Sequence, residues 1–181
     1  MNNYETETQR KNIAWFLPRP RLAGIKDANI GGMPLYAEQW LLQLARDILN
    51  GYAPKILNLF CGMNEEGVRV DIRPEVNPDI VCDAHKLTGY LQDKFDIILA
   101  DPPYSDEEAE QLYKTPKLNY KKWTEEATKL LNPNGLLIVY HKYIMPNPNP
   151  EIYTVVKRVF IGHRTYHLPR VAIYFQKRGE K

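Results

Sequence analysis

The 181-residue sequence contains only two cysteines, Cys61 and Cys82, and both lie in apolar segments typical of β-strands. This favours reduced thiols in a cytoplasmic protein over a disulfide framework. Long apolar runs are also missing. Neither a secretory h-region nor a stretch of about 20 apolar residues is present, so we expect no membrane span. The formal net charge is only +2, so charge alone identifies no partner.

What remains is the composition of an ordinary globular domain, with 44% hydrophobic residues. We predict a polar and basic N-terminal arm over residues 1–30 and one folded domain over residues 31–181. Between Arg10 and Lys26 the arm holds five basic residues and no acidic one. Such a segment is either a solvated surface arm or a contact for nucleic acid.

The most informative stretch is FDIILADPPY, residues 95–104. Its apolar run predicts a strand that is buried on both faces of a parallel sheet. The turn Asp101-Pro102-Pro103-Tyr104 that follows is stiff, because proline fixes φ, lacks an N–H and restricts the residue before it. In open α/β sheets, ligands bind just beyond the carboxyl ends of the strands, which is where this turn lies.

The turn offers two acceptors, the Asp101 carboxylate and the Pro102 carbonyl, beside the flat Tyr104 ring. Two acceptors that hold both hydrogens of an aromatic amine favour a tetrahedral nitrogen with a free lone pair, while the ring stacks on an unstacked base. The turn resembles the D/N/S-P-P-Y/F/W motif of S-adenosylmethionine-dependent amino-methyltransferases, which methylate N6 of adenine or N4 of cytosine. The alternative is a plain Asp-Pro turn before a helix, since residues 105–108 form a good capping box.

A second group of candidate residues lies at the ends of the two strands predicted at residues 56–60 and 68–71. Gly62 lets the backbone approach a ligand closely. Asp71 can hold two vicinal ribose hydroxyls, or it can simply cap its strand. These segments resemble motifs one and two of class I methyltransferases, and residues 82–84 resemble motif three, although Asp83 is also a candidate helix cap. The resemblance implies that S-adenosylmethionine contacts Phe60, Cys61, Gly62, Asp71, Ile72, Asp83 and Ala84.

Only residues 63–67 separate the first turn from the second strand. A parallel crossover usually takes a dozen or more residues with a helix, whereas so few extended residues, at roughly 3.3 Å each, return only the length of a short strand. We therefore predict that the helix between the first two strands is missing. The motif G-x-G-x-x-G is also absent, which argues against a dinucleotide phosphate site.

Residues 111–123 interleave basic and aromatic side chains, a mixture suited to a phosphate backbone and unstacked bases. A loop beside a helix, with Trp123 in the core, is an equally good interpretation. The candidate nucleic-acid contacts are Lys114, Lys117, Lys121 and Lys122. We expect no metal site, because His163 and His167 have no third ligand near them in sequence.

The resemblance covers about residues 55–177 and implies an α/β fold: a single doubly wound, Rossmann-like methyltransferase domain. Its mixed seven-stranded sheet would have the order 3-2-1-4-5-7-6, with strand 7 antiparallel. The implied activity is methylation of an exocyclic amine of a nucleic-acid base, most readily N6 of adenine in DNA. No segment is long enough for a separate target-recognition region, so a partner subunit is one candidate for recognising the target sequence of the nucleic acid. Alternatives are a methyltransferase of rRNA or another RNA, and a non-catalytic nucleic-acid-binding subunit that kept the fold.

Overall fold

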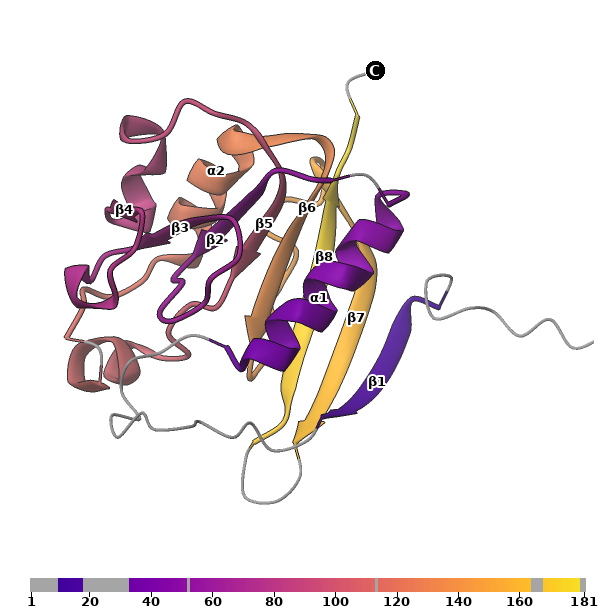
Figure 1. Cartoon of the computed structure of the whole chain (residues 1–181), viewed down its shortest axis with the longest axis horizontal. Helices are drawn as coiled ribbons and strands as arrows, with labels where there is room; N and C mark the ends of the chain where they lie inside the picture. Colours follow the sequence, from indigo (N-terminus) through magenta and orange to yellow (C-terminus); the bar gives the residue numbers. More distant parts are fainter. Residues whose placement is uncertain (1–9, 18–32, 52, 113, 164–167, 180–181) are drawn as a thin grey trace, which may run out of the picture.

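The structure is a computed structural model that describes residues 10–17, 33–51, 53–112, 114–163 and 168–179. Its strands form one eight-stranded sheet (Figure 1). The strands are β1 (Asn12–Leu17), β2 (Ile56–Leu59), β3 (Val68–Asp71), β4 (Ile80–Val81), β5 (Phe95–Ala100), β6 (Leu131–His141), β7 (Tyr153–His163) and β8 (Arg170–Lys177). The α-helices are α1 (Leu35–Ile48) and α2 (Tyr120–Leu130), and the short helices are η1 (Pro74–Val76), η2 (Ala84–Gly89) and the π-helical η3 (Glu108–Leu112).

Seven of the strands follow the predicted order. The sheet runs β4-β3-β2-β5-β6-β8-β7 from one edge, which is the order 3-2-1-4-5-7-6, and β1 is added beyond β7. Strand β8 is antiparallel to both of its neighbours, and the other pairs are parallel. The predicted doubly wound α/β fold is confirmed.

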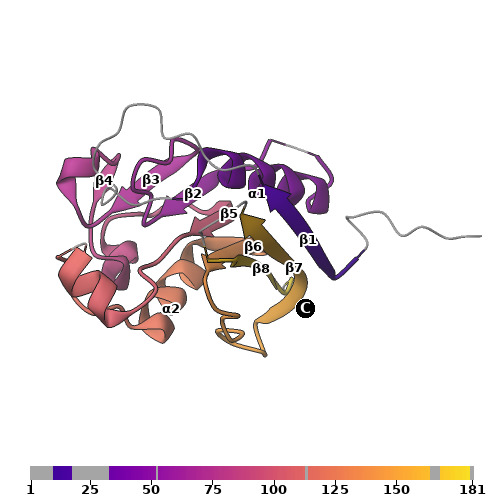
Figure 2. The same ribbon diagram turned by 90° about the horizontal axis from the view of Figure 1, so that it is seen from below.

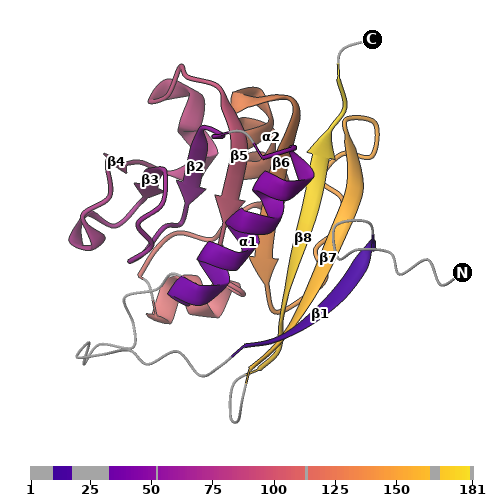
Figure 3. The same cartoon turned by 45° about the vertical axis from the view of Figure 1, so that its right-hand side comes forward.

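Strand β1 corrects the predicted boundary between the arm and the domain. It pairs in parallel with β7 at the edge of the sheet (Figure 3). Its alternate side chains Ile13 and Trp15 are buried in the core, and the Trp15 ring meets Trp40 of α1 edge-on at 5.6 Å. Residues 12–17 therefore belong to the folded domain, because an apolar face and a row of backbone hydrogen bonds hold them to the sheet.

Strand β5 is buried on both faces, as its apolar run predicts. Ile97 and Leu99 belong to the core on the side of α1, whereas Ile98 and Ala100 belong to the core on the side of α2. The two helices lie on opposite faces of the sheet (Figure 2). Helices cover both faces of the sheet, and in open α/β sheets ligands bind beyond the carboxyl ends of the parallel strands, so a site is expected at that end.

The link between β2 and β3 contains no helix, and all its residues are described. The prediction of a missing helix is therefore confirmed. Gly67 has φ +76°, and a Cβ there would lie 2.5 Å from the Ile56 carbonyl oxygen, so the link passes directly against β2. The fully buried Glu38 of α1 accepts a hydrogen bond from the Asn58 side chain at 2.7 Å. Side-chain contacts from α1 thus support a region that a helix would otherwise cover.

Among the described residues, no helix combines the length and the apolar character that crossing a bilayer requires.

Candidate active site

A pocket opens where β2, β3 and β5 end. It encloses about 750 Å³, counting space open to solvent. The four residues of the Asp-Pro-Pro-Tyr turn form part of its wall. Five of the seven predicted cofactor contacts also line it: Phe60, Asp71, Ile72, Asp83 and Ala84. We call it the first pocket.

Cys61 and Gly62 do not line the first pocket, and their contact with a cofactor stays a prediction. Cys61 is fully buried, and burial together with the nearby Asp71 carboxylate raises the pKa of its thiol to about 12. The backbone N–H of Gly62 donates to Asp71 Oδ2 at 3.0 Å. In this structure both residues brace the turn after β2.

The Asp71 carboxylate is held in place from several sides. Besides the Gly62 N–H, it accepts from the backbone N–H of Arg73 at 3.0 Å and from the Arg73 guanidinium at 3.2 and 3.3 Å. The side chain is only 5% exposed. Each carboxylate oxygen can accept more than one hydrogen bond, so ribose hydroxyls would share Asp71 with Arg73.

Asp83 caps η2, accepting from the His85 backbone N–H at 2.9 Å, and this bears out its alternative role as a helix cap. Its Oδ1 also lies 2.8 Å from His85 Nδ1. His85 Nε2 in turn accepts from the backbone N–H of Asn119 at 2.9 Å. Asp83 and His85 line the first pocket together with Leu118. His85 therefore connects Asp83 to Asn119. The sequence did not reveal this role, since Asn119 lies 34 residues further along the chain.

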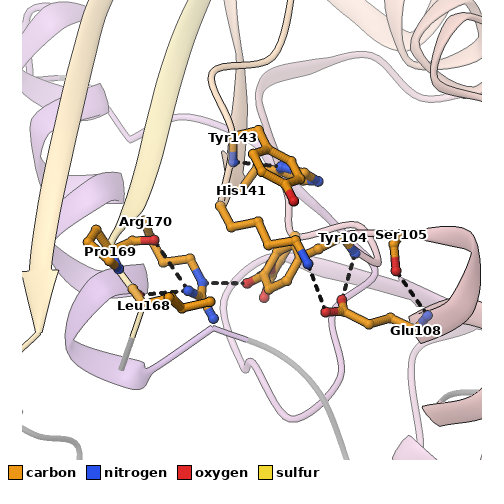
Figure 4. A network of polar contacts seen from close by, with 10 residues as sticks. Tyr104, Ser105, Glu108, His141, Tyr143, Leu168, Pro169 and Arg170 are labelled. Atoms are coloured by element: carbon orange, nitrogen blue, oxygen red, sulfur yellow. Dashed lines mark hydrogen bonds and ion pairs between the residues drawn. The ribbon is translucent and has the colours of Figure 1, made fainter. Parts of the chain in front are cut away.

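The Asp-Pro-Pro-Tyr turn is closed by its own side chains. The Tyr104 hydroxyl donates to Asp101 Oδ1 at 3.1 Å. Arg170 Nε donates to the Tyr104 oxygen at 3.0 Å (Figure 4). The Arg170 guanidinium carbon lies 4.7 Å from the centre of the Tyr104 ring, and Lys142 Nζ lies 5.5 Å from it. In this state, cations contact the ring that the sequence assigned to base stacking.

The surroundings of Asp101 change its acidity. Burial raises the pKa of Asp101 to about 7 and nearby Glu108 adds to the rise, while the Tyr104 hydrogen bond and the Arg170 charge oppose it. Burial also raises the pKa of Tyr104 well above its ordinary value, and the Asp101 charge adds to this. Tyr104 therefore keeps its proton and donates to Asp101.

Glu108 links the turn to Lys142, the residue that follows β6. Its carboxylate accepts from the Tyr104 backbone N–H at 3.0 Å and from Lys142 Nζ at 3.1 Å, and its own N–H donates to Ser105 Oγ at 3.2 Å (Figure 4). This is the expected capping box with the Glu108 carboxylate bound to residue 104 instead of 105. The capping-box spacing of residues 105–108 predicted a contact from Glu108. No local sequence pattern predicts that Lys142 and Arg170 lie beside the turn.

A second pocket lies on the other side of the turn and encloses about 660 Å³, counting open space. It shares with the first pocket Pro102, Pro103, Tyr104 and Leu118. The rest of its wall is mostly aromatic: Ser105, Asp106, Tyr120, Trp123, His141, Tyr143 and Met145.

The four predicted substrate lysines are exposed, and none of them lines either pocket. Lys117 pairs with Asp106 at 3.2 Å and Lys121 with Glu125 at 3.9 Å, so neighbouring acids offset part of their charge. Trp123 is fully buried, as the alternative interpretation of this segment expected. The structure thus brings the turn and most of the cofactor candidates together and leaves the lysines on the surface nearby.

Within the described ranges, no three or more His, Cys, Asp or Glu side chains gather closely enough to hold a metal ion. The side chains of His163 and His167 lie outside the described residues.

The sheet order and the antiparallel β8 define the class I methyltransferase fold. The N-methyltransferase NodS from Bradyrhizobium japonicum WM9, solved with S-adenosyl-L-homocysteine, is 15% identical, with a TM-score of 0.57 over 86% of this chain and 93% of that chain. TrmN from Thermus thermophilus is 17% identical, with a TM-score of 0.57 over 83% of this chain and 51% of that chain. No family model matches the chain, and no curated protein matches it in sequence. Likeness at this level of identity establishes the fold.

Proposed function

We propose that the chain is an S-adenosylmethionine-dependent methyltransferase that methylates an exocyclic amine of a nucleic-acid base, with N6 of adenine in DNA as the first candidate. One observation carries the proposal: two pockets meet across the Asp-Pro-Pro-Tyr turn. The first has carboxylates suited to a nucleoside, and the second has aromatic walls suited to a base. A methyl donor and an amine bound on the two sides would be held at short range, which is the main requirement of a displacement reaction.

The polar groups that line the first pocket suit S-adenosylmethionine. Asp71 would offer an oriented carboxylate to the ribose hydroxyls, and by resemblance to motif three Asp83 and Ala84 would contact the edge of the adenine. Phe60 and Ile72 add apolar surface. NodS, which shares the fold, was solved with the demethylated product of this cofactor. When bound, the cofactor supplies an electrophilic methyl group on a sulfonium.

The role of Asp101 follows from its present hydrogen bond. The oxygen that accepts from Tyr104 at 3.1 Å would instead accept an N–H of the substrate amine. Positive charge grows on that nitrogen during methylation, and a carboxylate placed beside it stabilises the transition state more than the ground state. With a pKa of about 7, Asp101 is also suited to take the amine proton at neutral pH.

Tyr104 would then have two duties. Its hydroxyl leaves Asp101 when the amine enters, and Arg170 Nε still holds the hydroxyl oxygen at 3.0 Å. Its ring lies between the two pockets, since it lines both. For recognition of the nucleic acid, we propose contacts from Lys114, Lys117, Lys121 and Lys122, with a partner subunit as a further source of sequence choice.

Nucleoside analysis of cells that express the chain tests the proposal. DNA and RNA are digested separately, and methylated adenine and cytosine are measured by mass spectrometry. We expect N6-methyladenine in DNA with the wild type and none above background with Asp101→Ala. The variant Glu151→Ala serves as control and should match the wild type, because Glu151 is exposed and lines neither pocket. Methylated bases in RNA alone would redirect the proposal to RNA, and methylated bases in neither pool would contradict it.

A further inference from the structure

His141 is the last residue of β6, and it stands beside the end of β5 where the Asp-Pro-Pro-Tyr turn begins. Its imidazole lines the second pocket and meets the Tyr104 ring edge-on, with ring centres 4.9 Å apart. The side chain is only 4% exposed. A histidine is thus built into the wall of the pocket proposed for the base, at the carboxyl end of the central strands.

The hydrogen bonds fix which nitrogen of His141 carries the proton. The backbone N–H of Tyr143 donates to His141 Nδ1 at 3.0 Å (Figure 4). Nδ1 is therefore an acceptor, and the neutral ring carries its hydrogen on Nε2. Burial lowers the pKa of His141 to about 4, and the Lys142 charge contributes, so the ring is neutral near pH 7. Among the described residues, no hydrogen bond is found at His141 Nε2, and this nitrogen is not one of the fully buried atoms without a partner, so it is open to a ligand or water in the pocket.

Trp123, which also lines the second pocket, carries a buried donor without an acceptor in the described ranges. Trp123 is fully buried, and its Nε1–H has no hydrogen-bond partner within the described part of the chain. A buried donor left unpaired is costly, so such groups usually belong to sites that bind a polar ligand or water. Aromatic walls with the His141 N–H donor among them fit a flat ring that has an acceptor atom on its edge.

We propose that the second pocket holds the acceptor base, and that His141 Nε2–H donates to a ring nitrogen of that base. The proposal rests on the proposed function and adds to it a specificity-determining residue. Adenine and cytosine both carry a ring nitrogen with a free lone pair next to the carbon that bears the amine. An aliphatic amine has no such atom, and His141 would be left unpaired beside it. His141 therefore selects aromatic amines with an adjacent ring acceptor.

Base analogues and two histidine variants test the assignment together. The probes are fluorescent single-stranded oligonucleotides with one adenine, one 1-deazaadenine or one 7-deazaadenine among abasic sites, and affinity is measured by anisotropy with S-adenosyl-L-homocysteine present. His141→Asn keeps an acceptor for the Tyr143 N–H but is too short to present the outer donor. His141→Gln places an amide N–H near the position of Nε2. Thermal unfolding checks that both variants fold.

We expect the wild type to bind the adenine probe about tenfold more tightly than the 1-deazaadenine probe, which lacks the ring nitrogen next to the amine-bearing carbon. The 7-deazaadenine probe keeps that nitrogen and should bind like adenine. His141→Asn should bind the two alike, and His141→Gln should regain part of the preference. The proposal is overturned if the wild type binds none of the probes, if it binds all three equally, or if His141→Asn keeps the preference.

Methyl transfer to the same probes separates the two claims. If the wild type prefers adenine over 1-deazaadenine but transfers no methyl group, the proposed function is contradicted and the pocket assignment stands. If it transfers a methyl group but binds adenine and 1-deazaadenine equally, the pocket assignment is contradicted and the proposed function stands.

Discussion

At the scale of single residues, Asp101 combines two properties that a methyltransferase of weak amines needs. Its carboxylate is already hydrogen-bonded to a donor, the Tyr104 hydroxyl, that a substrate amine can replace. Its pKa is near neutrality, because burial opposes ionisation while Tyr104 and Arg170 favour it. The balance between these effects makes the charge of Asp101 sensitive to small changes around it.

The rate of methyl transfer should therefore depend on pH in one direction. Below about pH 7, Asp101 is mostly protonated and one oxygen no longer accepts, so kcat/KM should rise with pH through about 7. Asp101→Asn has no such ionisation and should show a lower and flatter profile. Steady-state rates of both proteins across the pH range check this. If kcat/KM of Asp101→Asn still rises near pH 7, the ionisation behind the rise belongs to another group.

Asp71 makes a separate prediction about cofactor binding. Removing a carboxylate that holds two hydroxyls should weaken the binding of S-adenosylmethionine by roughly 1.5–3 kcal/mol, or about ten- to a hundredfold. Titration calorimetry of Asp71→Ala measures this. Asp79→Ala is the matched control, since Asp79 pairs with Arg69 at 3.1 Å outside the first pocket. Equal affinity for both variants would remove Asp71 from the site.

At the scale of elements, the helix-free link between β2 and β3 depends on contacts from the α1 side. Asn64 and Met33 exchange two hydrogen bonds, at 3.0 and 3.2 Å, which tie the link to the start of α1. Glu38 of α1 is hydrogen-bonded to the side chain of Asn58 in β2. The region that turns toward the first pocket is therefore held by polar side chains in place of a helix.

Removing Glu38 should loosen this region. Glu38→Ala removes the nearer acceptor of the buried Asn58 amide, which keeps only its 3.3 Å hydrogen bond to the Glu66 carbonyl, so the free energy of unfolding should fall by about 1–3 kcal/mol. Urea denaturation measures the change. Glu125→Ala is the control, because Glu125 is an exposed partner of Lys121 and should alter stability by less than about 1 kcal/mol. Equal stability of the two variants would show that Glu38 does not support the link.

The sequence predicts elements more readily than the contacts between them. The buried run 97–100 and the short spacing 63–67 are local signals, and both gave correct predictions. Strand β1 was missed as part of the sheet because its partner β7 lies more than 140 residues further along the chain. The contact of Arg170 with Tyr104 spans 66 residues and has no local signature. Candidate residues carried by a motif could thus be named from the sequence, whereas those supplied by the end of the chain could not.

At the scale of the whole molecule, the net charge is small and the proposed nucleic-acid contact is local. If Lys114, Lys117, Lys121 and Lys122 each meet a phosphate, neutralising all four should lower the slope of log affinity against log salt by ~3–4. Anisotropy of labelled DNA across a salt series gives the slope. The ion pairs with Asp106 and Glu125 would have to open on binding. An unchanged slope would place the phosphate contacts elsewhere on the surface.

The measurement that tests the central claim most directly is single-turnover transfer of a labelled methyl group by the purified chain. Wild type and Asp101→Ala are each mixed with labelled S-adenosylmethionine and an adenine-containing DNA strand, and the product is digested to nucleosides. We predict label on the amine of adenine, a rate lower on the order of a hundredfold or more in Asp101→Ala, and cofactor affinity close to wild type. No label on any base with the wild type, or equal rates for the two proteins, would contradict the account.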